Sequence, residues 1–278
     1  MNTDVSVIIP THNRRHTLER ALTSVVQQRH PAHEIIVVDD GSTDGTADWL
    51  RSAWPAVTLL EQDNRGVSAA RNRGIARSSA TWIALLDSDD AWHPDKLAHQ
   101  IAALRTDGRC RLCHTDETWY RNGVRVNPRQ RHRKSGGDIF TQCLPLCAIS
   151  PSAAVIHRDV FEDIGEFDES LPACEDYDFW LRLCARESVL YVDEALVIKT
   201  GGHDDQLSRR YPAMDRFRIQ SLLQLLETVE LSPEYYRAAL DTLDGKLKVY
   251  GNGARKRGRA DEVERLQARR DALTERTD

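Results

Sequence analysis

The sequence predicts an α/β protein whose mostly parallel sheet carries helices on both faces, followed by a helical C-terminal extension. Two patterns support this class. Through Leu104, short apolar runs rich in β-branched residues alternate with segments whose apolar residues recur at helical spacing. Strands that alternate with helices at this interval form parallel sheets joined by right-handed crossovers. From Pro212 onward, the apolar spacing is helical throughout.

The first half of the chain supplies four strands of the expected sheet. Residues 5–9 form an apolar, β-branched run that Pro10 ends, and comparable runs follow. The expected strands are residues 5–9, 34–38, 57–60 and 81–86. The expected helices between them are residues 18–26, a segment through Trp49 and Leu50, and residues 66–76.

The second half is expected to complete the sheet less regularly. A helix that begins near Pro94 buries Leu97, Ile101 and Leu104. Asn122-Gly123 between two β-rich runs predicts a hairpin. The polar residues 127–138 predict a loop. The other expected elements are strands 112–120, 124–126, 152–157 and 189–198, a helix over 176–185, and C-terminal helices 214–228, 233–249 and 260–273.

The bulk composition excludes several classes of protein. With 278 residues, 40% hydrophobic and 29% charged, the chain resembles an ordinary soluble globule with room for one large domain and an appendage. The net charge of −5 argues against nucleic acid as a partner. No apolar run reaches the roughly 18 residues of a membrane span, and the early strand at Val5 leaves no room for a secretory signal. The cysteines, including Cys110-x-x-Cys113, are expected to be reduced thiols of a cytoplasmic protein.

The strongest functional signal is the acidic turn, residues 87–90 (Asp-Ser-Asp-Asp), which directly follows the apolar strand ending at Leu86. The C-terminal ends of parallel strands open into the ligand crevice of α/β proteins, so these carboxylates are expected to face a site. Crowded carboxylates repel one another, and a hard divalent cation that also binds a diphosphate would hold them together. The alternative, a solvated acidic turn, does not explain the apolar strand immediately upstream.

A second acidic pair, Glu175 and Asp176, begins a helix whose Phe179 and Leu183 pack inward. Acidic residues are common at helix starts because of the helix dipole alone. Asp176 is also a candidate general base that takes a proton from an acceptor hydroxyl.

Polar residues follow the first two strands as well. Thr11 and Asn13, after the first strand, are expected to meet a nucleotide, unless this turn only caps the next helix. Asp39 and Asp40, after the second strand, can accept a hydrogen bond from an imide or amide N–H of uracil, thymine or guanine. Helix capping explains Ser42 but not both carboxylates.

Three further candidates carry or acquire positive charge. Arg71 lies in a helix that opens with small residues, whose free N–H groups suit phosphate, although a solvated arginine is the default. His203, in a glycine-led loop, is a candidate third metal ligand against the default of a solvated histidine. Residues 129–134 form a basic run, either a solvated loop or a contact for an anionic acceptor or a membrane surface.

Taken in order, these segments resemble the family 2 glycosyltransferases, which have the GT-A fold with its Rossmann-like sheet. The matching segments are residues 5–13, 34–44, 66–75, 82–97 and 175–183. The resemblance implies a GT-A catalytic domain over residues 1–211, with a nucleotide-binding half (1–110) and an acceptor-binding half (111–211). Residues 212–278 then form a helical C-terminal extension that has no counterpart in the resemblance.

The resemblance also implies a role for each candidate residue. Asp176 matches the catalytic base, and Trp180 lies in the same helix near the acceptor. Asp89, Asp90 and His203 are the implied ligands of Mg²⁺ or Mn²⁺. The residues implied to contact the nucleotide and its diphosphate are Thr11, Asn13, Asp39, Asp40, Arg71, Asp87 and Ser88.

The implied reaction is a single in-line displacement that inverts the anomeric carbon and releases a nucleoside diphosphate. A UDP-sugar is the favoured donor. The implied acceptor is a hydroxyl of a glycan or lipid-linked glycan in polysaccharide or lipopolysaccharide synthesis. The expected location is cytoplasmic, with peripheral association at the inner face of the cell membrane, and the C-terminal helices are expected to allow a homodimer.

Three other functions compete with this interpretation. A sugar nucleotidyltransferase shares the sheet and the metal chemistry, but it carries a glycine-rich loop with a basic residue where this chain has Pro10-Thr11-His12-Asn13. A non-catalytic module that binds sugar nucleotides would not need a retained base. An NAD-dependent oxidoreductase is disfavoured because no G-x-G-x-x-G follows the first strand.

Overall fold

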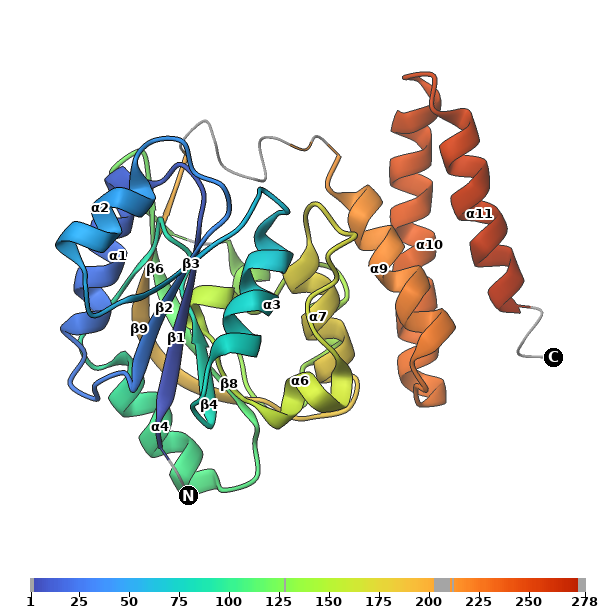
Figure 1. Cartoon of the computed structure of the whole chain (residues 1–278). Coiled ribbons are helices and arrows are strands. Elements are labelled where there is room, and N and C mark those ends of the chain that lie inside the picture. Colours follow the sequence, from blue (N-terminus) through green and yellow to red (C-terminus); the bar gives the residue numbers. More distant parts are fainter. Residues whose placement is uncertain (1–2, 128, 203–210, 212, 275–278) are drawn as a thin grey trace.

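The fold is built on one mixed sheet, which a computed structural model describes over residues 3–127, 129–202, 211 and 213–274 (Figure 1). In the described residues its nine strands run in the order β3-β2-β1-β4-β8-β6-β9-β5, with β7 paired to β6.

The parallel half of the sheet agrees with the sequence prediction. Its strands are β1 (Val5–Thr11), β2 (Glu34–Asp39), β3 (Thr58–Glu61) and β4 (Trp82–Leu85), and each pairs in parallel with its neighbours in this half. The helices between them are α1 (Arg15–Val26), α2 (Thr46–Ala53) and α3 (Val67–Arg77). Because helices cover both faces, β1 and β4 are buried along their whole length and need uninterrupted apolar runs.

Beyond β4 the direction of pairing changes. β8 (Val155–His157) runs antiparallel to both β4 and β6 (Leu112–Arg121), although a mostly parallel sheet was expected. The cause lies just before β8, where Pro151–Ala153 forms a turn of 3-10 helix. Ser152 in this turn is hydrogen-bonded to the acidic turn after β4, so the chain enters β8 at the edge where β4 ends. The same turn shortens the strand predicted from residue 152.

The remaining strands finish the sheet on the side away from β3. β9 (Leu190–Gly201) is parallel to β6 and antiparallel to the two-residue β5 (Ala91–Trp92). β7 (Val124–Val126) forms the predicted hairpin with β6, and Asn122 and Gly123 both have positive φ, as a tight hairpin turn requires. The other helical segments of this half are α4 (Lys96–Asp107), the 3-10 turn Gln130–His132, α5 (Phe140–Cys143), α6 (Asp159–Ile164) and α7 (Glu175–Cys184).

Helices cover both faces of the sheet, as predicted. Apolar residues of α1, α2 and α4 pack with Val5, Val7 and Ile9 on one face. On the other face, α5, α6 and α7 pack with Ile8 and Ile83 and neighbouring strand residues, and α3 lies over β1 and β2.

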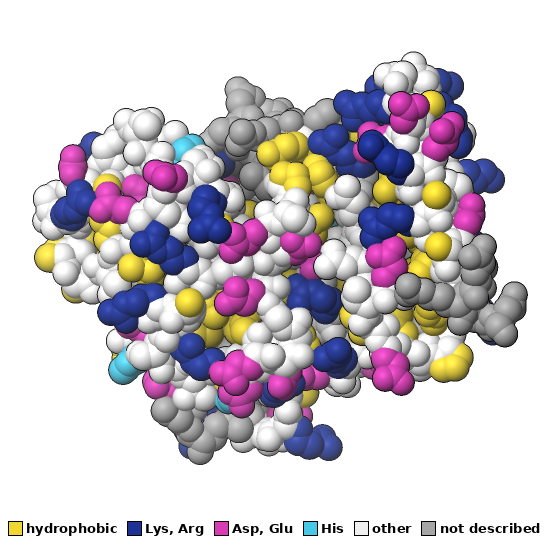
Figure 2. Space-filling model, turned by 45° about the vertical axis from the view of Figure 1, so that its right-hand side comes forward, with side chains coloured by type: hydrophobic (Ala, Val, Ile, Leu, Met, Phe, Trp, Pro, Cys, Tyr) yellow, Lys and Arg dark blue, Asp and Glu magenta, His cyan; other side chains and the backbone are white. Residues whose placement is uncertain are grey.

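The C-terminal helices extend the second of these cores. They are α9 (Asp215–Thr228), α10 (Pro233–Arg255) and α11 (Ala260–Thr274), close to their predicted bounds. α9 packs against α7 and α10, so the helices stand beside α7, on the opposite side of the molecule from α1 and α2 (Figure 1). Figure 2 shows basic and acidic side chains interspersed over the face that these helices share with the sheet and its covering helices.

Lys96, the first residue of α4, is completely buried. Its Nζ lies 4.0 Å from the centre of the Trp92 ring and has no hydrogen-bond partner in the described part of the chain. Burial lowers the pKa of Lys96 to about 7. Because this value lies below the ordinary 10.5, the unfolded state holds the proton more tightly, and the free energy of unfolding rises with pH between about 7 and about 10.5.

We therefore expect Lys96→Met, which keeps the apolar stem and removes the ammonium group, to be more stable than the wild type near neutral pH. This advantage should shrink as the pH is raised toward 10, because the wild type then buries a neutral amine. Urea unfolding of both proteins at pH about 7 and about 10 measures the difference. An advantage of equal size at both pH values would contradict the buried-amine interpretation.

Candidate active site

The ends of β1, β2 and β4 meet at one edge of the sheet and bring most of the predicted nucleotide-binding residues together. The β1 and β2 ends are directly paired, with Thr11 opposite Asp39, and the Asp40 N–H donates to the Thr11 carbonyl over 2.9 Å. Thr11 is buried, and its hydroxyl has no hydrogen-bond partner among the described residues. Asn13 ties the two loops together, because its Oδ1 accepts from the Thr43 N–H at 2.7 Å.

Asp39 and Asp40 are both buried, and the carboxylate of each accepts hydrogen bonds from backbone N–H groups. Asp39 accepts from the Ser42 N–H at 2.9 Å. Asp40 accepts from the N–H groups of Arg65 and Gly66, each at 2.8 Å, and from the Gln62 side chain. Asp40 therefore positions the segment that leads into α3, a role that the sequence interpretation did not include. The predicted contact of Asp40 with a base remains a prediction.

Within the acidic turn, the three carboxylates have different surroundings. Asp87 and Asp89 are partly exposed, and each is paired with an arginine: Asp87 with Arg71 at 2.8 Å and Asp89 with Arg14 at 3.0 Å. Ser88 is buried. These positions agree with a turn that presents carboxylate oxygens at the edge of the sheet.

Asp90 is the buried member of the acidic turn. One carboxylate oxygen accepts from the Ser152 hydroxyl at 2.7 Å and the other from the Thr200 N–H at 2.9 Å. Burial raises the pKa of Asp90 to about 8, although the Lys199 ammonium opposes this shift. The geometry favours Asp90 as an anchor that joins the turn to β8 and β9, rather than the metal ligand expected from the sequence.

Arg71 joins the two acidic segments. It lies on α3 with 3% of its side chain exposed, and its two terminal nitrogens contact Glu175 Oε1 at 2.6 Å and Asp87 Oδ1 at 2.8 Å. The guanidinium also lies 5.3 Å from the centre of the Phe167 ring. The end of β4 and the start of α7, which are far apart in sequence, are thus held together by one cation. The predicted contact of Arg71 with the nucleotide is untested, and its observed partners are carboxylates.

At the start of α7 the two acidic residues have separate environments. Glu175 is buried against Arg71, whereas Asp176 is half-exposed. The Asp176 carboxylate accepts a hydrogen bond from the backbone N–H of Tyr177 and another from the Cys147 thiol at 3.2 Å. Trp180 is completely buried and packs edge-on against Phe179, so its ring has no exposed surface, and the expectation that it lies near an acceptor stays a prediction.

Several residues near the site were not predicted from the sequence. Arg14 and Lys199 supply positive charge, and Ser150 and Ser152 supply hydroxyls from the turn before β8. One signal was available for Lys199, because it is a charge at the end of an otherwise apolar run (residues 195–198). The basic run is also divided: Lys134 is buried and paired with Glu117 at 2.9 Å, while its arginines are exposed.

A metal site is not preformed in the described part of the chain, where no three His, Cys, Asp or Glu side chains are grouped as ligands. His203 lies outside the described residues, so its predicted role is untested. The donor set of Asp87 and Asp89 still fits a hard cation, because Mg²⁺ is commonly bound by one or two carboxylates together with substrate phosphates and water.

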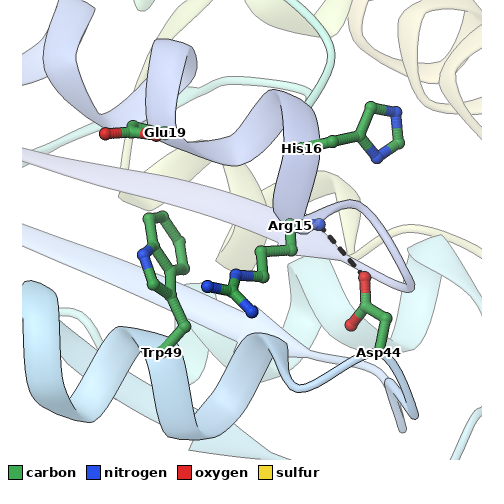
Figure 3. A pocket seen from close by; sticks show the side chains of 5 residues that line it. All are labelled: Arg15, His16, Glu19, Asp44 and Trp49. Atoms are coloured by element: carbon green, nitrogen blue, oxygen red, sulfur yellow. Dashed lines mark hydrogen bonds between the residues drawn. The ribbon is translucent and has the colours of Figure 1, made fainter.

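Two surface cavities lie away from the acidic turn. One, of about 360 Å³, is lined by Arg15, His16, Glu19, Asp44 and Trp49 between α1 and α2 (Figure 3). The other, of about 210 Å³, is lined mainly by the basic run and by Tyr191 and Asp193. Neither cavity is lined by Asp87, Asp89 or Asp176.

The parallel half-sheet, the acidic turn at its edge and the carboxylate at the start of α7 define an α/β protein with its candidate site at the C-terminal ends of the strands. Residues 6–165 match the model of Glycosyl transferase family 2. The chain belongs to this family.

Relatives by sequence agree with this membership. An uncharacterized glycosyltransferase of Rickettsia typhi is 33% identical over 208 residues, which are 73% of this chain and 65% of that protein. TuaG of Bacillus subtilis, assigned provisionally to teichuronic acid biosynthesis, is 44% identical over 102 residues, or 35% of this chain and 40% of that one. The chain thus spans about two-thirds or less of the length of these relatives.

Solved structures with the same fold include two transferases. TarS of S. aureus, residues 1–349 in complex with UDP, has a TM-score of 0.63 at 22% identity and covers 92% of this chain and 74% of that one. The mannosyltransferase PcManGT of Pyrobaculum calidifontis, in complex with GDP-Man and Mn²⁺, has a TM-score of 0.62 at 21% identity, over 95% and 85% of the two chains. The predicted GT-A fold is confirmed. In the described part of the chain, no helix is both long and apolar enough to cross a bilayer.

Proposed function

We propose that this chain transfers a sugar from a nucleoside-diphosphate donor to an acceptor hydroxyl, with inversion at the anomeric carbon and with the help of a divalent cation. The observation that carries this proposal is the Arg71 bridge, which holds the donor-side acidic turn next to the start of α7. A leaving diphosphate and an attacking hydroxyl need charged groups on opposite sides of one reacting carbon, and this bridge brings such groups together.

Asp176 is the proposed base. Of the two acidic residues at the start of α7, Glu175 is buried in its pair with Arg71, so only Asp176 is open to a substrate. The Tyr177 N–H and the Cys147 thiol orient its carboxylate. In the reaction, Asp176 takes the proton of the acceptor hydroxyl as the new glycosidic bond forms. Glu175 acts through Arg71 and is a positioning residue.

Asp87 and Asp89 are the proposed contacts for the divalent cation. When bound, Mg²⁺ or Mn²⁺ would neutralise charge that develops on the departing diphosphate. Thr11, Asn13 and Asp39 are proposed to line the nucleoside position, where the unpartnered Thr11 hydroxyl offers a hydrogen bond.

A UDP-sugar is the proposed donor, and a glycan of the cell surface or its lipid-linked precursor is the proposed acceptor. Support for UDP comes from TarS, whose solved structures contain UDP and UDP-GlcNAc. A GDP-sugar is the second candidate donor, because PcManGT is in complex with GDP-Man. Support for the acceptor class comes from the provisional assignment of TuaG. Incubation with radiolabelled UDP-sugars and membrane glycan extracts tests both. A transferase releases a nucleoside diphosphate and leaves the labelled sugar on the acceptor, whereas a nucleotidyltransferase leaves the UDP-sugar intact unless pyrophosphate is supplied.

Asp89→Ala is expected to remove the part of nucleoside-diphosphate affinity that depends on Mn²⁺, a loss of at least about tenfold. The reason is that the variant loses a carboxylate ligand while the nucleoside pocket is unchanged. Thermal shifts with UDP, measured with Mn²⁺ and with EDTA, report this difference. Asp48→Ala, which removes an exposed carboxylate of α2, is the control and should keep the wild-type response to Mn²⁺. The same Mn²⁺ response in Asp89→Ala would exclude Asp89 as a ligand.

A further inference from the structure

Lys199 lies at the end of β9 on the face of the strand that points into the protein. Strand residues alternate between faces, so Lys199 lies on the same side as the buried Val197, whereas Ile198 between them is exposed. The neighbouring strand β6 places Glu117 opposite Val197 and Trp119 opposite Lys199. At the end of β9, the inward-facing residue that follows the apolar Val197 is therefore a lysine.

The surroundings of Lys199 are acidic on several sides. Burial alone would lower the pKa of Lys199, but the carboxylates of Glu117, Asp90, Asp87 and Asp176 raise it above its ordinary value. These groups come from β6, from the acidic turn and from the start of α7. Lys199 is thus a charged ammonium that lies within electrostatic reach of both the cation-binding carboxylates and the proposed base.

The nearest carboxylates are already bonded to other groups. Glu117 pairs with Lys134 and accepts from the Trp119 ring N–H, and Asp90 accepts from Ser152 and Thr200. In the described part of the chain, the hydrogen bond of Lys199 goes to a neutral group, the Ser150 hydroxyl, at 2.8 Å. An ammonium carries three donors, so two remain for a ligand.

Among the described residues, three other cations lie near the acidic turn. Arg71 binds Asp87 and Glu175 together, and Arg14 binds Asp89. Arg20, which is exposed, donates to the Asp89 carbonyl and to the Thr200 hydroxyl. An anion that enters between the acidic turn and Asp176 would meet carboxylates on both sides, and it needs a positive group that is not already neutralised.

We propose that Lys199 binds the diphosphate of the donor and supplies a charge contact that does not require a divalent cation. This assignment rests on the proposed function, because it takes a nucleoside diphosphate as the ligand of the site. The ammonium holds the diphosphate between the acidic turn and Asp176 through the two donors that Ser150 leaves open. Affinity for a nucleoside diphosphate in the absence of metal then depends on Lys199, whereas affinity for the nucleoside alone does not.

The test compares UDP, GDP and dTDP with the corresponding nucleosides by isothermal titration in EDTA and in Mn²⁺. Wild-type protein is expected to bind its preferred nucleoside diphosphate weakly in EDTA and more tightly in Mn²⁺. Lys199→Met should bind the diphosphate about 10-fold to 100-fold more weakly in EDTA, the usual range for a lost charge-assisted hydrogen bond. Its affinity for the nucleoside should be unchanged. Lys199→Arg should keep most of the affinity in EDTA, because the positive charge is retained.

Two matched variants separate ligand binding from folding. Lys246→Met removes another partly buried lysine, which lies on α10 and donates to the Pro145 carbonyl and to Asp215. This variant should bind the nucleoside diphosphate like the wild type. Lys199→Gln keeps a hydrogen-bond donor for Ser150 without the charge, and it gives the same comparison if the methionine variant does not fold.

Each contrary result has a defined meaning. If Lys199→Met or Lys199→Gln melts earlier but binds the diphosphate as tightly as the wild type in EDTA, Lys199 is only a counter-ion for Asp90 and the proposal is wrong. It is equally wrong if the wild type binds a diphosphate in Mn²⁺ but not in EDTA, although the proposed function then stands. If no nucleoside diphosphate binds the wild type under either condition, the proposed function itself fails.

Discussion

Asp176→Asn is expected to reduce sugar transfer by about 100-fold to 10,000-fold, the usual contribution of a general base. The amide has nearly the shape of the carboxylate, and its oxygen can still accept a hydrogen bond from the Tyr177 N–H. The first turn of α7 should therefore be unchanged in the variant. What the variant loses is the basic oxygen that takes the proton from the acceptor hydroxyl. Binding of a nucleoside diphosphate should stay within a few-fold of the wild type, because the acidic turn is unchanged.

Initial rates of nucleoside-diphosphate release, together with affinities from titration calorimetry, measure both parts of this prediction. Asp159→Asn is a suitable control, since Asp159 also begins a helix but is exposed on α6, away from the site. If Asp176→Asn transferred sugar at the wild-type rate, another group would have to be the base. If it lost donor binding as well, Asp176 would be a structural residue.

Arg71→Met is expected to lower the free energy of unfolding by about 3–5 kcal/mol, the usual loss when one partner of a buried ion pair is removed. Both Asp87 and Glu175 would lose their cation, and Glu175 would remain buried without another charge to offset it. Urea unfolding measures this loss. Arg65→Met is the control, because the pair of Arg65 with Glu169 joins the segment before α3 to the segment before α7, but its side chains are 63% and 39% exposed. It should change stability by about 1 kcal/mol or less.

The double variant Arg71→Met with Glu175→Gln tests the reason for this loss. If the loss comes from the orphaned carboxylate, removing its charge should restore part of the stability lost in Arg71→Met, so the two changes are not additive. A double variant that is less stable by the sum of the single effects would show that Arg71 acts mainly through its packing against Phe167.

The elements whose patterns are local were predicted well. β1 and β4 are apolar runs that are buried along their whole length, and β2 is buried from Ile36 onward. The helices between these strands show their buried residues at helical spacing. The hairpin at Asn122-Gly123 was also predictable, because these two residues tolerate the positive φ that the turn needs. The direction of β8 was not, since a three-residue strand has no periodicity that reports its orientation. Hydrogen bonds between Ser152 and the acidic turn decide it.

For the site, the position of the acidic turn at the end of an apolar strand and the pair at the start of α7 were both recognisable in the sequence. Their different roles were not. Asp90 and Asp89 are neighbours of one type, yet Asp90 is buried between Ser152 and Thr200 while Asp89 is partly exposed and faces Arg14. Nor did the sequence show that the register of α7 turns the Trp180 ring into the core.

By itself, the sequence determined which segments form strands and helices, and which carboxylates follow a strand or begin a helix, because both depend on residues that are close along the chain. Only the tertiary structure decided that Arg71 binds Asp87 and Glu175 at once, and that Lys199 lies among carboxylates from three separate elements. Charge pairing depends on distance in space and on burial, and neither quantity is recorded in the order of the residues.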